Sequence, residues 1–315
     1  MQHKTKILIL AAISMALIAI FMTIEVNGNW DYIIPRRITK ILAIIATSIA
    51  IAISTVIFQT ISNNRILTPN VLGLDSLYML VQTSVVFLFG STSITMVNKN
   101  INFLLSIGMM ILFSGILYKV LFSKEKQNIY FILLTGFIAG TFFDSITSFM
   151  QVLIDPNEFL IVQDRMFASI NNVDSDLVLI SFIGIGIVLL SMKKLFNYLD
   201  VLALGRDNAV NLGVSYDSVV KRLLVVVVVL ISIATALVGP LTFLGLLITN
   251  IAYEIFKTYQ HRYILLGSVF IGIIALVGGQ LIVERVFTFS TTVSVIINFV
   301  GGIYFIYLLL RGSRT

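Results

Sequence analysis

The chain has 315 residues, of which 58% are hydrophobic and only 11% are charged. Soluble domains contain about 25% charged residues, so this composition excludes an ordinary soluble protein and indicates an integral membrane protein. The absence of cysteine excludes disulfides and thiolate metal sites. The net charge of +6 lies mostly in short loops without interleaved aromatic residues, which argues for membrane orientation and against nucleic-acid binding.

The apolar runs are continuous, which indicates helices rather than a barrel, because in lipid only these two structures satisfy the backbone. A spanning helix needs about 20 apolar residues. The sequence therefore predicts an all-α membrane fold, one domain over residues 1–315 with ten spans. We place the spans at 7–26, 38–61, 71–89, 101–121, 129–154, 177–195, 223–238, 243–256, 264–283 and 293–310.

Lys and Arg predict the orientation of these spans, because cytoplasmic loops carry the excess of both residues. When ten spans alternate, most Lys and Arg fall on the side of the N-terminus, so we expect both termini in the cytoplasm. On the other side lies a polar, acidic segment, residues 155–176. We expect this segment to form a short interfacial helix, and a solvated connector is the alternative to any specific role for it.

Two similar motifs interrupt the apolar pattern. In each, a proline is followed within a few residues by Leu-Gly-Leu, and the spans that the motifs open run in opposite directions. Such pairs are typical of inverted-repeat transporters, with chance similarity of two Leu/Gly-rich strings as the alternative. The motif residues are Pro69, Leu72, Gly73, Gly239, Pro240, Phe243 and Gly245.

A polar island, residues 200–222, separates the sixth span from the seventh. We predict a short helix over 202–212, with Gly205 near its start and Gly213 after its end, and a second helix from Tyr216. Two such helices would form a rigid cytoplasmic knob on which a separate motor subunit could dock. The alternative is an ordinary connector.

The order of these motifs resembles the FecCD-type permeases, the membrane subunits of bacterial ABC importers for iron–siderophore complexes, haem and cobalamin. The similarity lies in LALG-x-x-x-A-x-x-LGV at 202–214 and GP-x-x-F-x-GL at 239–246, and extends to 33–42 and 63–76. The string NNRILTP followed by LGLDSLY resembles the branch for catecholate siderophores. The chain departs from the family at Ile33, where an arginine is usual, and at Thr249-Asn250, where Pro-His is usual.

The resemblance implies a subunit that imports ferric siderophores by alternating access in a bacterial cell membrane. Its partners would be a second permease subunit, ATP-binding subunits and an extracytoplasmic siderophore-binding protein. ATP and Mg²⁺ would be bound by the ATP-binding subunits, because this chain has no phosphate-loop motif. We therefore expect a transport subunit, not an enzyme, with no cofactor or metal of its own. The residues expected to couple to the ATPase are Leu202, Leu204, Gly205, Arg206, Asp207, Ala209, Leu212 and Gly213.

Three arginines are expected on the outer face, where topology disfavours cations: Arg36, Arg37 and Arg285. The resemblance implies that outer arginines pair with acidic residues of the binding protein, and a guanidinium suits carboxylates. Arg36 and Arg285 match family positions, whereas Arg37 does not. Contact with lipid headgroups is the alternative for all three.

Asp144 lies inside the fifth predicted span with no cation within a helical turn. A charge at this depth costs at least about 2.5–3.5 kcal/mol, so it should line the translocation path or bond to a neighbouring helix. A different class, an ion- or proton-coupled secondary transporter, would use Asp144 as its coupling site but would leave the polar island unexplained. An intramembrane enzyme would need a nucleophile with a base or a metal set, and two histidines without cysteine argue against it.

Overall fold

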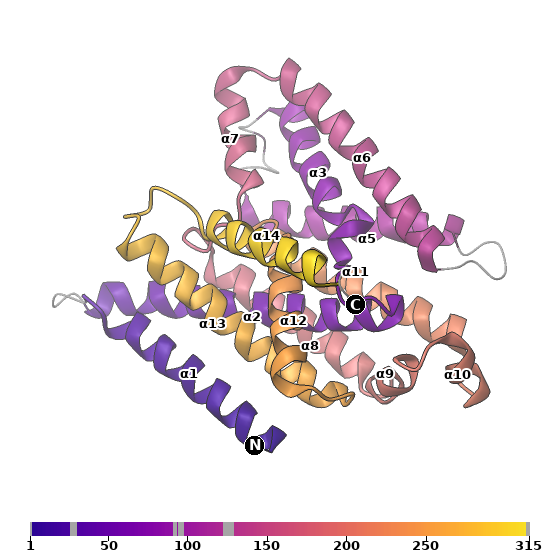
Figure 1. The fold of residues 1–315 in the computed structure, drawn as a ribbon. Coiled ribbons are helices and arrows are strands. Elements are labelled where there is room, and N and C mark those ends of the chain that lie inside the picture. The colour runs from indigo at the N-terminus through magenta and orange to yellow at the C-terminus, as the bar shows by residue number, and fades with distance from the viewer. Residues whose placement is uncertain (1, 26–29, 91–92, 94–97, 122–128, 313–315) are drawn as a thin grey trace.

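The computed structural model describes residues 2–25, 30–90, 93, 98–121 and 129–312, and every regular element in these ranges is a helix (Figure 1). In chain order the elements are α1 (His3–Thr23), α2 (Trp30–Ser62), the 3-10 helix η1 (Pro69–Leu72), α3 (Leu74–Phe89), α5 (Lys99–Leu121), α6 (Ile129–Leu153), α7 (Pro156–Met166), α8 (Ser175–Met192), α9 (Phe196–Leu202), α10 (Arg206–Asn211), α11 (Tyr216–Val238), α12 (Leu244–Phe256), α13 (His261–Arg285) and α14 (Val293–Gly312).

Each predicted span coincides with one helix. Seven helices, α1, α2, α5, α6, α8, α11 and α13, are long and apolar enough to cross a membrane. The other three predicted spans correspond to α3, α12 and α14, which are apolar but shorter. Their assignment as spans stays a prediction, and the chain is a multi-pass, all-helical membrane protein in either case.

The central helices α2 and α11 form the core of the bundle. Their apolar windows are 83% and 72% buried, whereas that of α1 is 17% buried and exposes leucine and isoleucine side chains. Small residues such as Ala50, Ser54 and Ala234 lie in this core and let the backbones approach closely. The outer helices therefore present the apolar surface that lipid or another subunit would cover.

Further helices pack around this core. In Figure 1, α3, α6 and α7 lie above α2, α1 lies below it, and α13 runs obliquely across it. Ion pairs at one end join Lys40 to Glu284 and Lys99 to Asp174. At the other end Lys6 of α1 donates to the Ile255 carbonyl of α12 (2.5 Å). These contacts join helices that are far apart in the sequence, and the sides on which the ten spans begin and end stay a prediction.

The polar island folds differently from the prediction in two respects. Leu202 ends α9 instead of beginning a helix, because Gly205 has a φ of +90° and separates α9 from α10. Tyr216 does begin a helix, but α11 continues from there to Val238 without a break. No glycine or proline occurs between these two residues, so nothing ends the helix after its polar first turns, and they continue into the apolar span as one helix.

Residues 156–166 of the polar outer segment form the short helix α7. Asp155 caps it, because its carboxylate accepts a hydrogen bond from the Asn157 backbone N–H (2.9 Å), and Pro156 occupies the first helical position. Both features are typical helix-start signals.

Candidate functional site

The two Gly/Pro motifs, far apart in sequence, meet beside the central helices. Asn70 Nδ2 donates to the Thr242 carbonyl (3.2 Å), and Thr242 Oγ1 donates to Asp75 Oδ2 (3.1 Å). Asn70 belongs to η1, Asp75 to the first turn of α3, and Thr242 to the turn before α12. The starts of two interrupted helices therefore face each other, as corresponding segments of an inverted-repeat transporter do.

Gly73 shows why this junction needs glycine. Its φ is +75°, in the left-handed region, where it ends η1 and begins α3. A Cβ at this position would lie 2.7 Å from Gly140 Cα in α6. Both the turn and the close approach of α6 exclude a side chain here.

A cavity of about 500 Å³ opens beside this junction, between η1, α3, α6, α12 and α14. Asp75 and Asp144 line it together with polar backbone and hydroxyl groups of the η1 segment. Its apolar walls include three aromatic side chains, Phe137, Phe243 and Phe305. A space of this kind can admit a bulky solute with polar and aromatic parts.

The structure brings Asp144 into this cavity, as the pathway hypothesis expects, and adds Asp75, which sequence reasoning missed. Within the described residues, neither carboxylate forms an ion pair, and Asp75 Oδ1 has no hydrogen-bond partner. A carboxylate directly after Leu-Gly-Leu in an apolar span was the available signal for Asp75.

The short helices α9 and α10 form a knob at one end of the bundle (Figure 1), and this knob exposes apolar side chains. Leu204, Val210 and Leu212 are 55%, 51% and 63% exposed, whereas Leu202 and Ala209 are buried beneath them. Of the predicted coupling residues, Leu204 and Leu212 therefore lie on the exposed surface of the knob. Arg206 and Asp207 lie in the first turn of α10. Gly213 adopts a φ of +84° directly after the C-cap Leu212, as predicted.

The three outer arginines have different environments. Arg37 is buried, and its guanidinium donates to the carbonyls of Phe21 (2.8 Å) and Met22 (3.1 Å) at the end of α1. Arg285 is bound to Glu25 and to the Ile24 carbonyl. Arg37 is therefore engaged within the chain, where it satisfies carbonyls at the end of α1, and its docking to a partner stays a prediction.

Arg36 is exposed and stacks its guanidinium 4.2 Å from the centre of the Tyr32 ring. It lines a hollow of about 600 Å³ with Lys40, Lys99 and Asp174. Arg36 is thus the one of the three outer arginines that the structure leaves available to an acidic partner.

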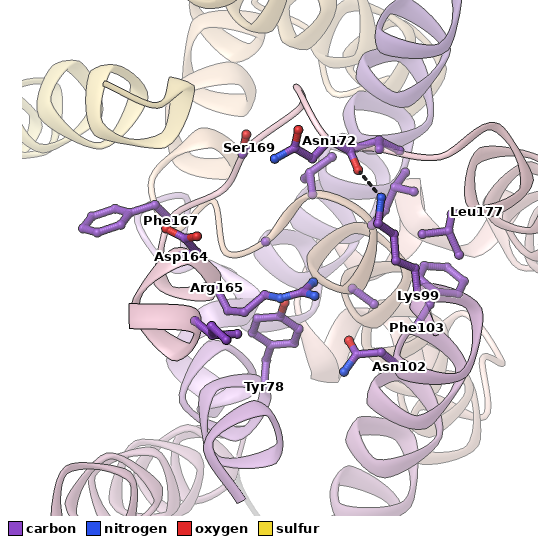
Figure 2. Close-up of a pocket in the computed structure, with 16 residues that line it drawn as sticks. Tyr78, Lys99, Asn102, Phe103, Asp164, Arg165, Phe167, Ser169, Asn172 and Leu177 are labelled. Atoms are coloured by element: carbon purple, nitrogen blue, oxygen red, sulfur yellow. Dashed lines mark hydrogen bonds between the residues drawn. The ribbon is translucent and has the colours of Figure 1, made fainter. Parts of the chain in front are cut away.

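A further cavity, of about 310 Å³, lies beside α7 (Figure 2). Arg165 reaches into it from α7 and points toward the buried Tyr78 of α3 (Figure 2). Lys99 enters from the opposite wall and donates to the Asn172 carbonyl (3.4 Å). Sequence reasoning used Arg165 only to assign orientation, because nothing in the sequence places it against Tyr78.

Metal ligands do not gather anywhere in the described part of the chain: no group of three or more His, Cys, Asp or Glu side chains could hold an ion there. The arrangement instead combines many apolar helices, two interrupted helices that face a cavity, and paired short helices at one end. These features define a polytopic membrane transport subunit.

The FecCD transport family model matches residues 5–311. The chain therefore belongs to the FecCD transport family, as its motifs predicted.

Three curated relatives are import-system permeases. The chain is 57% identical over 315 residues, all of both chains, to the petrobactin import system permease protein YclO of Bacillus subtilis (strain 168). It is 40% identical over 282 residues to the petrobactin import system permease protein FatC of Bacillus anthracis, covering 89% of this chain and 79% of FatC. It is 25% identical over 330 residues to the petrobactin import system permease protein YclN of Bacillus subtilis (strain 168), covering 98% of both chains.

The fold is also similar to a solved structure assigned as a metal-chelate type ABC transporter in an inward-facing conformation. The TM-score is 0.85 at 17% identity, and the match covers 98% of this chain and 99% of that chain. At this identity the similarity concerns the fold.

Proposed function

We propose that this chain is the permease subunit of an ATP-driven importer of a ferric siderophore of the petrobactin, catecholate type. The observation that carries the proposal is the 57% identity over the whole chain to a petrobactin import permease. The chain is a transport component rather than an enzyme, and it binds no cofactor of its own. ATP and Mg²⁺ are bound by separate ATP-binding subunits.

The cavity lined by Asp75 and Asp144 supports a translocation path along this face of the permease. Four segments surround it: η1–α3, α6, α12 and α14. They could move relative to one another, because α3 and α12 each begin directly after a break in the helical chain. The cargo is bulky and the cavity carries no metal-ligand cluster, so selection of iron falls to the extracytoplasmic binding protein.

The partner permease is a homologous chain rather than a second copy of this one. Bacillus subtilis (strain 168) has two petrobactin import system permease proteins, YclO and YclN. This chain is similar to the first at 57% identity and to the second at 25%. The chain would therefore occupy the place of the first in a pair of different permeases.

The ATP-binding subunits would grip Leu204, Val210 and Leu212 on the cytoplasmic side of a bacterial cell membrane, where both termini also lie. The siderophore-binding protein would dock outside, with Arg36 as the permease cation that meets an acidic residue. These assignments rest on the Lys/Arg distribution and on the exposure of the named side chains.

Transport of ferric petrobactin into sealed, right-side-out vesicles tests the proposal. The complete importer is assembled from this chain, a YclN-type permease, the ATPase and the binding protein. We expect uptake that requires ATP inside the vesicles and survives a protonophore. Uptake without ATP that a protonophore abolishes would overturn the proposal and favour a proton-coupled transporter based on Asp75 and Asp144.

A further inference from the structure

A chain of polar contacts, exposed at Asp200 and buried at His261 and Thr60, joins the knob of α9 and α10 to two long helices. Asp200 lies in α9, His261 is the first residue of α13, and Thr60 lies near the end of α2. Asp200 Oδ1 is 2.6 Å from His261 Nδ1, and His261 Nε2 is 2.8 Å from Thr60 Oγ1. Because each ring nitrogen is bound to a different helix, the imidazole cannot turn without breaking one of the contacts.

Asp200 also holds the backbone of α13. Its Oδ1 accepts a hydrogen bond from the His261 backbone N–H (2.8 Å), whereas Gln260, the residue that precedes α13, provides no side-chain cap. The first N–H groups of a helix need such acceptors, and a carboxylate near a helix start is favourable. A residue of α9 therefore serves as the cap of a long membrane helix.

The chain is shielded from water on the side of the membrane helices. The His261 side chain is 6% exposed, whereas that of Asp200 is 48% exposed. The carboxylate can only accept, so Nδ1 carries the hydrogen of this bond. A hydrogen bond to a charged group in such a setting is stronger and more directional than the apolar contacts around it.

The knob itself is tied to Asp200 by its own backbone. Gly205 N–H donates to the Leu202 carbonyl (3.0 Å), and Asn208 Nδ2 donates to the Leu204 carbonyl (2.8 Å). A displacement applied at Leu204 or Leu212 would therefore reach Asp200 without an intervening flexible linker.

We propose that Asp200 and His261 are positioning residues that carry the movement of α9 and α10 to α13 and α2. This inference rests on the proposed function, in which an ATPase grips the knob. The contacts keep ATP hydrolysis and cargo movement in step, and neither residue touches cargo or nucleotide.

The test uses the complete importer in proteoliposomes, with this chain, its partner permease, the ATPase and the binding protein. The variants are Asp200→Ala, His261→Ala and their combination, and Arg262→Ala is the matched control. Arg262 adjoins His261 but is exposed and bonds only locally, to Gln260 among the described residues (2.9 Å). Assembly, ATPase rate and uptake of ferric petrobactin are measured on the same preparations.

We expect the alanine variants to assemble and hydrolyse ATP, while the amount of cargo moved per ATP falls by about tenfold, within the range of typical coupling between sites. The double variant should be no worse than either single one, because both break the same link. Asp200→Asn should retain most coupling, since its amide oxygen still accepts from Nδ1 and from the His261 N–H.

Wild-type cargo per ATP in Asp200→Ala and His261→Ala would overturn the inference, and so would equal losses with Arg262→Ala. If the alanine variants fail to assemble, Thr60→Val decides, because it removes the hydroxyl that meets Nε2 and leaves Asp200 and His261 in place; the same hydroxyl also bonds the Val56 carbonyl of its own helix (2.7 Å). Unchanged coupling in Thr60→Val then refutes the link, and a loss supports it. Failure of the wild-type chain to recruit any ATPase would instead refute the proposed function.

Discussion

Replacing Gly73 with alanine should destabilise the junction at which α3 begins. The left-handed backbone, with φ of +75°, costs an alanine about 1–2 kcal/mol. The added Cβ would lie 2.7 Å from Gly140 Cα, and such overpacking against backbone costs about 1–3 kcal/mol. Together these terms lower the free energy of unfolding by about 2–5 kcal/mol, or the melting temperature by about 4–10 °C.

Thermal unfolding of the detergent-solubilised chain, followed by intrinsic fluorescence, measures this loss. Gly278→Ala is the matched control, because Gly278 lies within α13 and a Cβ there meets nothing within 4 Å. Alanine in a helix interior is favoured over glycine by about 0.5–1 kcal/mol, so the control should not be destabilised. A Gly73→Ala protein with the same melting temperature as the Gly278→Ala control would refute the close packing of η1 on α6.

Three further predictions concern the remaining sites. Arg37→Ala leaves the carbonyls at the end of α1 without donors and should lower the free energy of unfolding by about 1–3 kcal/mol. Arg36→Ala should change the free energy of unfolding by no more than about 0.5 kcal/mol but should weaken capture of the binding protein in a pull-down assay. A stable Arg37→Ala protein, or an Arg36→Ala protein that melts early and still captures the binding protein, would contradict these separate roles. Leu212→Asp should abolish co-purification of the ATPase from folded protein, whereas Leu202→Asp, at a buried position, should lower expression instead; retained ATPase with Leu212→Asp would exclude this surface. Asp75→Asn keeps an acceptor for Thr242 Oγ1, so the free energy of unfolding should change by no more than about 0.5 kcal/mol while uptake of the siderophore falls. Uptake at the wild-type rate would show that the charge of Asp75 is not needed.

The positions of the helices were largely predictable because lipid leaves few choices. Apolar runs must become helices, so run length predicted each helix from α1 to α14 that could span. Helix ends were less predictable, since they depend on local breakers. Gly205 divides the polar island, but the stretch after Tyr216 has no breaker and joins α11.

The roles of charged residues were less predictable, because they depend on which helix ends lie side by side. Arg36 and Arg37 are adjacent in sequence, yet Arg37 points at the end of α1 and Arg36 at solvent. The contact between Asp200 and His261 joins residues far apart in the chain, and neither belongs to a recognisable motif. Asp144 was found because it stands alone in a span, whereas Asp75 was hidden by its place beside a glycine turn.

The shortness of α12 has a consequence for the electrical insulation of the membrane. Its 13 residues rise about 20 Å, less than the hydrocarbon thickness of about 30 Å. If α12 spans the membrane as the sequence predicts, the turn at 239–243 and side chains such as Phe243 and Phe305, whose ring centres are 6.1 Å apart, would complete the insulating layer there. The membrane potential would fall across a thinner layer there than in the surrounding lipid, which steepens the local electric field.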